Sequence, residues 1–195
     1  MTTQVSGHHK KGITIYDIAV TALFAALCYV ATTFFKIEIP TPVGRTMMHA
    51  GNIFCLLAAL LLGPARGAAA DAIGMGLSDI LSVWIASAPS TIVMRFCMGL
   101  VTGAVPKLGG GTSKHSMKWV IIGAVSGMFT YYVLYLGYSF LKDLILGNAV
   151  ATCLADVGVK AVTSGITGIL SVIAACLLYI PFHKALTAAG YYRKR

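Results

Sequence analysis

The sequence predicts an all-α membrane protein, a bundle of six transmembrane helices with both termini in the cytoplasm. Of its 195 residues, 57% are hydrophobic and only 11% are charged, and the mean hydropathy is +0.82. Soluble domains carry nearer a quarter of charged residues, so the composition leaves little room for an additional soluble domain. The apolar residues also fall into long runs, each near the roughly 20 residues that a helix needs to cross a bilayer.

Six such runs account for the chain as a single integral membrane domain, residues 1–195. The predicted spans are about 14–35, 46–62, 66–86, 89–107, 117–141 and 160–183, after a polar, basic cytoplasmic tail at 1–12. Gly63-Pro64 ends the second run, which must begin before His49 to reach across, and Pro89 opens the fourth. Ile18–Phe35 is too long for the hydrophobic region of a cleaved signal peptide, so we expect a retained first span.

Lysine and arginine set the expected orientation, because cytoplasmic loops of membrane proteins carry an excess of both. With the N-terminus inside, the cytoplasmic segments hold Lys10, Lys11, Arg66, Lys107, Lys114, Lys118, Lys184, Arg193, Lys194 and Arg195. The outer loops hold only Lys36, Arg45, Lys142 and Lys160. This asymmetry favours both termini in the cytoplasm, and it explains the net charge of +9 without a nucleic-acid partner.

Small residues four positions apart predict where helices approach closely. Gly99 and Gly103 form one such pair, and Gly123 and Gly127 form another. We expect both pairs to pack within the bundle, since small residues let two backbones come together. The pair Ala22 and Ala26 lies in the first span, where a smooth surface could instead serve a partner protein.

Ionisable groups inside apolar runs mark the candidate site, because each costs roughly 2.5–3.5 kcal/mol in a membrane helix. At about 1.5 Å per residue, Asp79 and Arg95 lie at similar depth in the outer half of consecutive spans, so a pair between them is plausible. A structural ion pair without a ligand is the alternative. Asp71 lies deeper, near Arg66 on the same helix, and is interpreted as a structural or coupling residue.

Other hydrogen-bonding side chains gather at the level of Asp79 and Arg95. They are His49, Asn52, Trp84, Thr91, Tyr131, Tyr135, Lys160 and Ser164. Trp84 could instead be an interfacial anchor, and His49 a satisfied histidine at a helix end. The convergence of four helices favours an outward pocket with aromatic walls, which suits a small, flat, water-soluble ligand.

Catalytic, metal and nucleotide motifs are not supported. The five cysteines show no CxxC spacing, four lie in apolar runs and Cys153 in a loop, so no disulfide framework, metal site or cofactor is expected. Asp71 and Asp79 project about 80° apart around a helix, which is too divergent for a shared metal. GGGTSK at 109–114 lacks the spacing of a phosphate-binding loop. Ser164-Gly165 has only His49 on its side of the membrane, which makes a protease a weak hypothesis.

Five short motifs are spread over most of the chain: Ala22-Leu-Phe-Ala-Ala26, HAGNIF at 49–54, LLGP at 61–64, GMGLSD at 74–79 and PSTIVMR at 89–95. With these motifs the chain resembles the S-components of energy-coupling factor (ECF) transporters, the membrane-embedded substrate-binding subunits of bacterial vitamin importers, and the likeness covers nearly the whole chain. The first motif matches the AxxxA pattern of the family's first helix. The other four resemble the subgroup of presumed pyridoxine or hydroxymethylpyrimidine carriers. That subgroup often has lysine where Arg95 stands, so the match at this position is chemical and not by identity.

The resemblance implies a mechanism and partners. The protein would capture a vitamin from outside a bacterial cell membrane beneath a lid at 36–48. It would then dock through Ala22 and Ala26 on a transmembrane coupling subunit, topple in the membrane and release the solute, with two ATPase subunits driving the cycle. Two alternatives are a stand-alone secondary carrier, which would place its site at the midplane between repeated halves, and a small membrane enzyme, which would need clustered carboxylates or a Ser/His pair.

Overall fold

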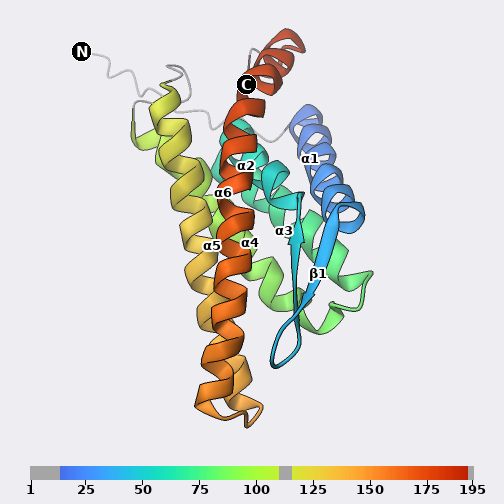
Figure 1. The fold of residues 1–195 in the computed structure, drawn as a ribbon. Helices are drawn as coiled ribbons and strands as arrows, with labels where there is room; N and C mark the ends of the chain where they lie inside the picture. The colour runs from blue at the N-terminus through green and yellow to red at the C-terminus, as the bar shows by residue number, and fades with distance from the viewer. Residues whose placement is uncertain (1–13, 110–115, 193–195) are drawn as a thin grey trace, which may run out of the picture.

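A computed structural model describes residues 14–109 and 116–192, in which six α-helices form a bundle with one β-hairpin against it (Figure 1). The elements in chain order are α1 (Ile15–Phe34), β1 (Lys36–Pro40), β2 (Arg45–His49), α2 (Gly51–Leu62), α3 (Pro64–Ile80), the short 3-10 helix η1 (Ile85–Ser87), α4 (Ala88–Leu108), α5 (Met117–Ile145) and α6 (Val150–Ala188). The predicted tail at 1–12 and most of the loop at 109–114 lie outside the described residues.

The helices differ in how well they suit a membrane crossing. Four segments of the described chain are long and apolar enough to cross by length and composition: α1, η1 with α4, α5 and α6. The protein is therefore a multi-pass membrane protein, as predicted. Helices α2 and α3 have only 12 and 17 residues, fewer than the roughly 20 of a full crossing. Six complete spans and a cytoplasmic location of both termini stay predictions.

Helix α2 forms the centre of the bundle, although it is the shortest α-helix described. It contacts each of the other five helices, and its residues Cys55–Leu62 are all buried. A helix that is apolar on every side is suited to such a position, because no face of it has to meet water. The second predicted span is thus an internal helix surrounded by the longer ones.

The predicted start of the second span was wrong. Arg45–His49 do not begin a helix but form β2, which pairs antiparallel with β1 from Lys36↔His49 to Pro40↔Arg45. The turn is closed by two backbone hydrogen bonds, from Thr41 N–H to the Gly44 carbonyl (2.9 Å) and from Gly44 N–H to the Thr41 carbonyl (3.2 Å). Alternating isoleucines followed by a Thr-Pro-Val-Gly turn are typical of a hairpin, and His49 consequently ends a strand.

Two other predicted boundaries also need correction. The sixth helix begins at Val150, ten residues before the predicted 160, so Cys153 lies in α6 and not in a loop. The connection from α5 is tight because Gly147 adopts a positive φ of 82°, which a glycine tolerates without strain. Helix α3 ends at Ile80, and a turn containing Trp84 then leads into η1, so the third span does not continue as one helix to 86.

The glycine pairs pack between helices, as the sequence predicted. A Cβ added at Gly99 would lie 2.5 Å from the Ala68 Cα of α3, and one at Gly103 would lie 2.5 Å from the Pro64 backbone nitrogen. On α5, a Cβ at Gly123 would lie 2.9 Å from the Thr102 carbonyl oxygen of α4. Because backbone atoms cannot move aside cheaply, α3, α4 and α5 are held at close range by these small residues.

Replacing Gly103 with alanine should therefore destabilise the protein, by about 1–3 kcal/mol as other overpacked sites do. The matched control is Gly137→Ala in α5, where an added Cβ meets no atom within 4 Å. Alanine favours a helix there, so the control should be neutral or slightly stabilising. Thermal unfolding of the purified proteins in detergent measures both, and equal melting temperatures for the two variants would contradict the close packing.

The beginning of α1 and the end of α6 lie at the same end of the bundle. The Tyr16 hydroxyl donates a hydrogen bond to the Ala189 carbonyl (3.2 Å), and Arg66 forms an ion pair with Asp17 (2.7 Å). Arg66 thus pairs with α1 and not with Asp71, which the sequence had placed near it. The hairpin and the α5–α6 turn lie toward the opposite end (Figure 1), where the candidate site is found.

Candidate functional site

A cavity with about 100 Å³ of free space lies beneath the hairpin, between β2 and helices α2 to α6. Every residue predicted for the pocket lines it: His49, Asn52, Asp79, Trp84, Thr91, Arg95, Tyr131, Tyr135, Lys160 and Ser164. Helix geometry predicted that these residues share one depth in the membrane, and in the structure they line one cavity. That they bind a solute stays a prediction.

Arg95 occupies the centre of the cavity wall and is only 1% exposed. Its Nη1 donates a hydrogen bond to the Asn52 Oδ1 (2.6 Å), and its guanidinium carbon lies 3.8 Å from the centre of the Tyr131 ring. Its Nη2 lies 3.4 Å from the His49 Nε2. A guanidinium can only donate hydrogen bonds, so the His49 Nε2 is the acceptor and the imidazole carries its proton on Nδ1.

Two hydrogen-bond donors in this group have no partner among the described residues: the Arg95 Nε and the His49 Nδ1. Both are buried, and a buried donor without an acceptor costs about 1–3 kcal/mol. A ligand with acceptor atoms would satisfy them, which makes Arg95 and His49 the natural polar contacts of this cavity.

The predicted direct pair between Asp79 and Arg95 was wrong. None of the ion pairs within the described residues joins them. The Asp79 carboxylate interacts with Thr91, while Arg95 bonds directly to Asn52 and approaches His49. Similar depth therefore does not bring Asp79 and Arg95 into an ion pair, because depth alone does not specify direction around a helix.

Aromatic residues of α5 form another wall. The rings of Tyr131 and Tyr135 are stacked, with centroids 5.6 Å apart and an angle of 9° between their planes, and Tyr138 lines the cavity one turn further on. The Tyr135 hydroxyl lies 3.0 Å from the Thr46 hydroxyl of β2, within hydrogen-bonding distance. The tyrosine wall is thereby connected to the hairpin that covers it.

Lys160 lines the cavity as predicted, and its amine also contacts three side chains of the wall. It donates a hydrogen bond to the Ser139 hydroxyl (2.6 Å) and forms ion pairs with Asp156 (2.5 Å) and Asp143 (3.7 Å). Two carboxylates thus balance its charge, and we infer that Lys160 holds this part of the wall together. An ammonium group has three donors, so a direct contact of Lys160 with a solute stays a prediction.

Asp156 also fastens the hairpin, a role that the sequence did not reveal. One of its carboxylate oxygens accepts a hydrogen bond from the Val43 N–H at the hairpin turn (2.9 Å). The hairpin's own charges are more exposed: Glu38 pairs with Lys36 (3.2 Å) and Arg45 (3.1 Å). The hydrogen bond from Lys36, reinforced by Arg45, lowers the pKa of Glu38.

Replacing Asp156 with asparagine should loosen the hairpin and speed solute release. Asparagine loses the charge that pairs with Lys160 and weakens the hydrogen bond to Val43, and bonds to a charged acceptor are worth about 1.5–3 kcal/mol. We expect a dissociation rate at least several times higher in stopped-flow measurements. Glu38→Gln is the matched control, because exposed ion pairs contribute only about 0–1 kcal/mol. An equal rate increase in this control would contradict the role of Asp156 in holding the hairpin.

The sequence missed several residues of the cavity, and most of them are of two kinds. Hairpin residues were missed because 45–49 was interpreted as the start of a helix, and methionines because an apolar side chain gives no functional signal. These two groups comprise Arg45, Thr46, Met47, Met75, Met94 and Met128. The other missed residues are Ser87, Ser90, Ser139 and Lys142. Methionine side chains are flexible and polarizable, so they can adapt their shape to an aromatic ligand.

Ala22 and Ala26 lie apart from the cavity, on an apolar groove between α1 and α3. Both alanines are exposed, and the groove has about 560 Å³ of space. Its α3 side carries small residues, among them Ala69 and Gly74, next to the larger Ile73 and Leu77. Asp17 and Arg66 also line it, so the groove is largely apolar and includes one charged pair.

Comparison with known proteins decides the family. The sequence model of the ECF-type riboflavin transporter S component family matches residues 12–187, which is nearly the whole chain. The chain belongs to this family. A relative from Pyrococcus woesei, described as an uncharacterised protein in the gap 3′ region, is 30% identical over 141 residues, covering 71% of this chain and 88% of the relative.

The predicted resemblance to ECF S-components is thus confirmed. The S-component family is one of transport proteins and not of enzymes, which agrees with the expectation that the protein is not an enzyme. The more specific resemblance to pyridoxine or hydroxymethylpyrimidine carriers is not confirmed, since the description of the family specifies riboflavin.

Proposed function

We propose that this S-component captures a small water-soluble vitamin, or a vitamin precursor, in the cavity beneath the hairpin and delivers it for ATP-driven uptake. The observation that carries the proposal is the buried Arg95, which, among the residues that the structure describes, has a donor without a partner and no ion pair with a carboxylate. An arginine buried in a membrane protein is energetically costly, so such residues usually mark functional sites. A solute with acceptor atoms supplies the missing contacts.

The chemistry of the cavity favours a solute with a single flat ring. Tyr131 and Tyr135 offer an aromatic wall, the Arg95 Nε and His49 Nδ1 offer donors, and Asp79 offers an acceptor for a ring N–H or a hydroxyl. The free space of about 100 Å³ is below the roughly 300–1,000 Å³ of most ligand pockets. A pyridoxine-like or hydroxymethylpyrimidine-like solute therefore fits this cavity better than the three-ring system of riboflavin.

We also propose that the groove between α1 and α3 receives a transmembrane coupling subunit, which works with two ATPase subunits. The exposed Ala22 and Ala26 permit close helix–helix contact, and the chain has no nucleotide-binding motif that could supply the energy itself. The protein would lie in the plasma membrane with the hairpin outside and both termini in the cytoplasm, as the distribution of lysine and arginine favours.

Titration calorimetry of the purified protein against pyridoxine, hydroxymethylpyrimidine and riboflavin tests the substrate. We expect tight binding of a single-ring compound and weak binding of riboflavin, and the opposite order would refute our substrate assignment. Uptake into vesicles that contain the coupling and ATPase subunits tests the transport role. Transport by this chain alone, without those subunits, would instead indicate a stand-alone carrier.

A further inference from the structure

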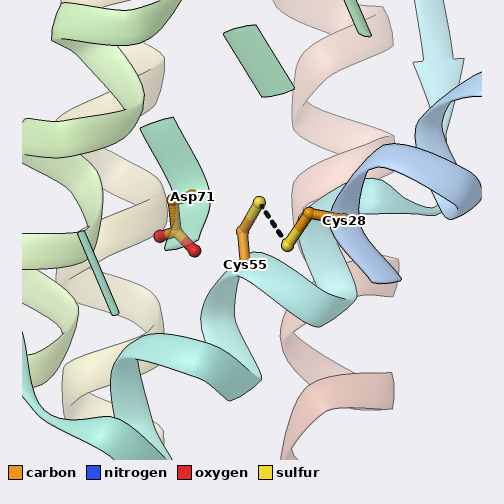
Figure 2. A group of neighbouring side chains, drawn as sticks. All are labelled: Cys28, Cys55 and Asp71. Atoms are coloured by element: carbon orange, nitrogen blue, oxygen red, sulfur yellow. Dashed lines mark hydrogen bonds between the residues drawn. The ribbon is translucent and has the colours of Figure 1, made fainter. Parts of the chain in front are cut away.

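Three side chains that play no part in the cavity meet inside the bundle: Cys28 of α1, Cys55 of α2 and Asp71 of α3. Figure 2 shows the two sulfur atoms and the carboxylate turned toward one another from their three helices. The two sulfurs are 3.5 Å apart, and each residue has a candidate ligand atom within 4.8 Å of the other two. All three residues are completely buried.

Asp71 is the unusual member of this group. Neither of its carboxylate oxygens has a hydrogen-bond partner within the described residues that meets normal geometry, and the side chain is 0% exposed. A charged group at such a place is costly without a compensating partner. The Arg66 that the sequence placed near it is paired with Asp17 instead, so the structure leaves Asp71 to be satisfied by something else.

We propose that Cys28, Cys55 and Asp71 bind one Zn²⁺ ion as thiolate, thiolate and carboxylate ligands. Zinc prefers this donor set, with Zn–S distances of about 2.3 Å and Zn–O distances of about 2.0–2.2 Å. Two sulfurs on one tetrahedral zinc lie about 3.8 Å apart at those bond lengths, close to the 3.5 Å between Cys28 and Cys55. The fourth position is open for a water molecule.

The charges balance when zinc is bound. Two thiolates and one carboxylate carry −3, and Zn²⁺ brings the cluster to −1. Arg95 interacts electrostatically with all three residues and supplies the remaining +1. Binding releases the two thiol protons to solvent, and the assembled group is neutral, as the interior of a membrane protein favours.

The cluster lies close to the cavity, so a bound ion would connect helices that carry cavity residues. Cys55 follows the cavity residue Asn52 by one turn of α2, and Asp71 precedes the cavity residue Met75 by one turn of α3. Zinc would thus join three helices one turn below the cavity floor. The sequence concealed this site because its ligands come from three separate helices, and Cys28 and Cys55 are 27 positions apart.

Metal analysis of the full-length protein, purified without chelators from cells grown with added zinc, tests the proposal. We expect about one Zn²⁺ per chain, as for other structural sites. Protein from cells grown with Co²⁺ should show thiolate-to-cobalt absorption in the near ultraviolet. A zinc-free protein under these conditions, or a disulfide between Cys28 and Cys55 in a non-reducing peptide map, would overturn the proposal.

Variants identify the ligands. The double variant Cys28→Ser, Cys55→Ser should contain no zinc, whereas Cys97→Ser, which changes a half-buried cysteine of α4 outside the cluster, should retain it. Asp71→Asn keeps both thiols but loses a direct zinc ligand. Loss of a residue that only supports a ligand weakens metal binding about 10–100-fold, so this variant should weaken zinc binding by more than that. If the double variant does not fold, the zinc affinity of Asp71→Asn is the test of the proposal. An undiminished zinc affinity in that variant would contradict the site.

Discussion

Replacing Arg95 with alanine will abolish measurable binding of the solute. The side chain is the hub of the cavity, where it bonds to Asn52, approaches His49 and lies over the ring of Tyr131. Loss of a buried, hydrogen-bonded charge at a binding site costs about 2–5 kcal/mol or more, which corresponds to at least a thirtyfold weaker affinity. Titration calorimetry with the preferred vitamin measures the change.

The same substitution should also lower the melting temperature in detergent, because Arg95 balances the buried charge of Asp71 and the two cysteines. Circular dichroism of the purified variant shows whether the helices are intact and so separates a loss of binding from a loss of the fold. Arg95→Lys should recover part of the affinity, since it keeps the charge but loses the planar fork. The matched control is Lys184→Ala, a cation on an exposed part of α6, and wild-type affinity in Arg95→Ala would refute the assignment of the pocket.

Substituting leucine for both Ala22 and Ala26 will stop uptake while solute binding survives. Both alanines are exposed on the groove between α1 and α3, away from the cavity, so the larger side chains would obstruct a partner helix without touching the solute. Steric overpacking costs about 1–3 kcal/mol at one site, so the two together should reduce uptake tenfold or more. Uptake by vesicles and calorimetry on the purified protein measure the two properties separately.

The control for this experiment is Ala19→Leu, which adds the same bulk to an exposed alanine of α1 that does not line the groove. It should transport normally. Loss of uptake in the control as well would mean that α1 tolerates no enlargement anywhere. Full uptake by the Ala22→Leu, Ala26→Leu variant would contradict docking through the groove.

Much of the cavity could be predicted from helix geometry alone. Depth along a helix follows from residue number, so Asp79, Arg95 and Tyr131 could be assigned to one level without coordinates. Direction around the helix axis depends on how the helices pack, which is why the expected contact between Asp79 and Arg95 was wrong. The stacked tyrosines needed only the spacing of residues on a single helix.

The hairpin and the hydrogen bond that joins it to Asp156 could not be predicted by such reasoning. Hydropathy locates apolar runs, but it does not tell a short strand from the first turn of a helix, so β2 was assigned to the second span. Hydropathy also does not reveal that a helix begins before its apolar part, so α6 was predicted to start at 160 instead of Val150. Asp156 lies in that missed portion, and its hydrogen bond to Val43 joins segments more than a hundred residues apart.

A single residue, Phe35, separates the last residue of α1 from the first of β1, and its carbonyl accepts a hydrogen bond from the Ala50 N–H at the start of α2 (3.0 Å). A connection of one residue leaves little backbone to absorb a tilt of α1 relative to the hairpin. If a coupling subunit docks on α1 as we propose, a tilt of α1 would therefore move the hairpin that covers the cavity. Docking and solute release would then be mechanically coupled through this short backbone segment.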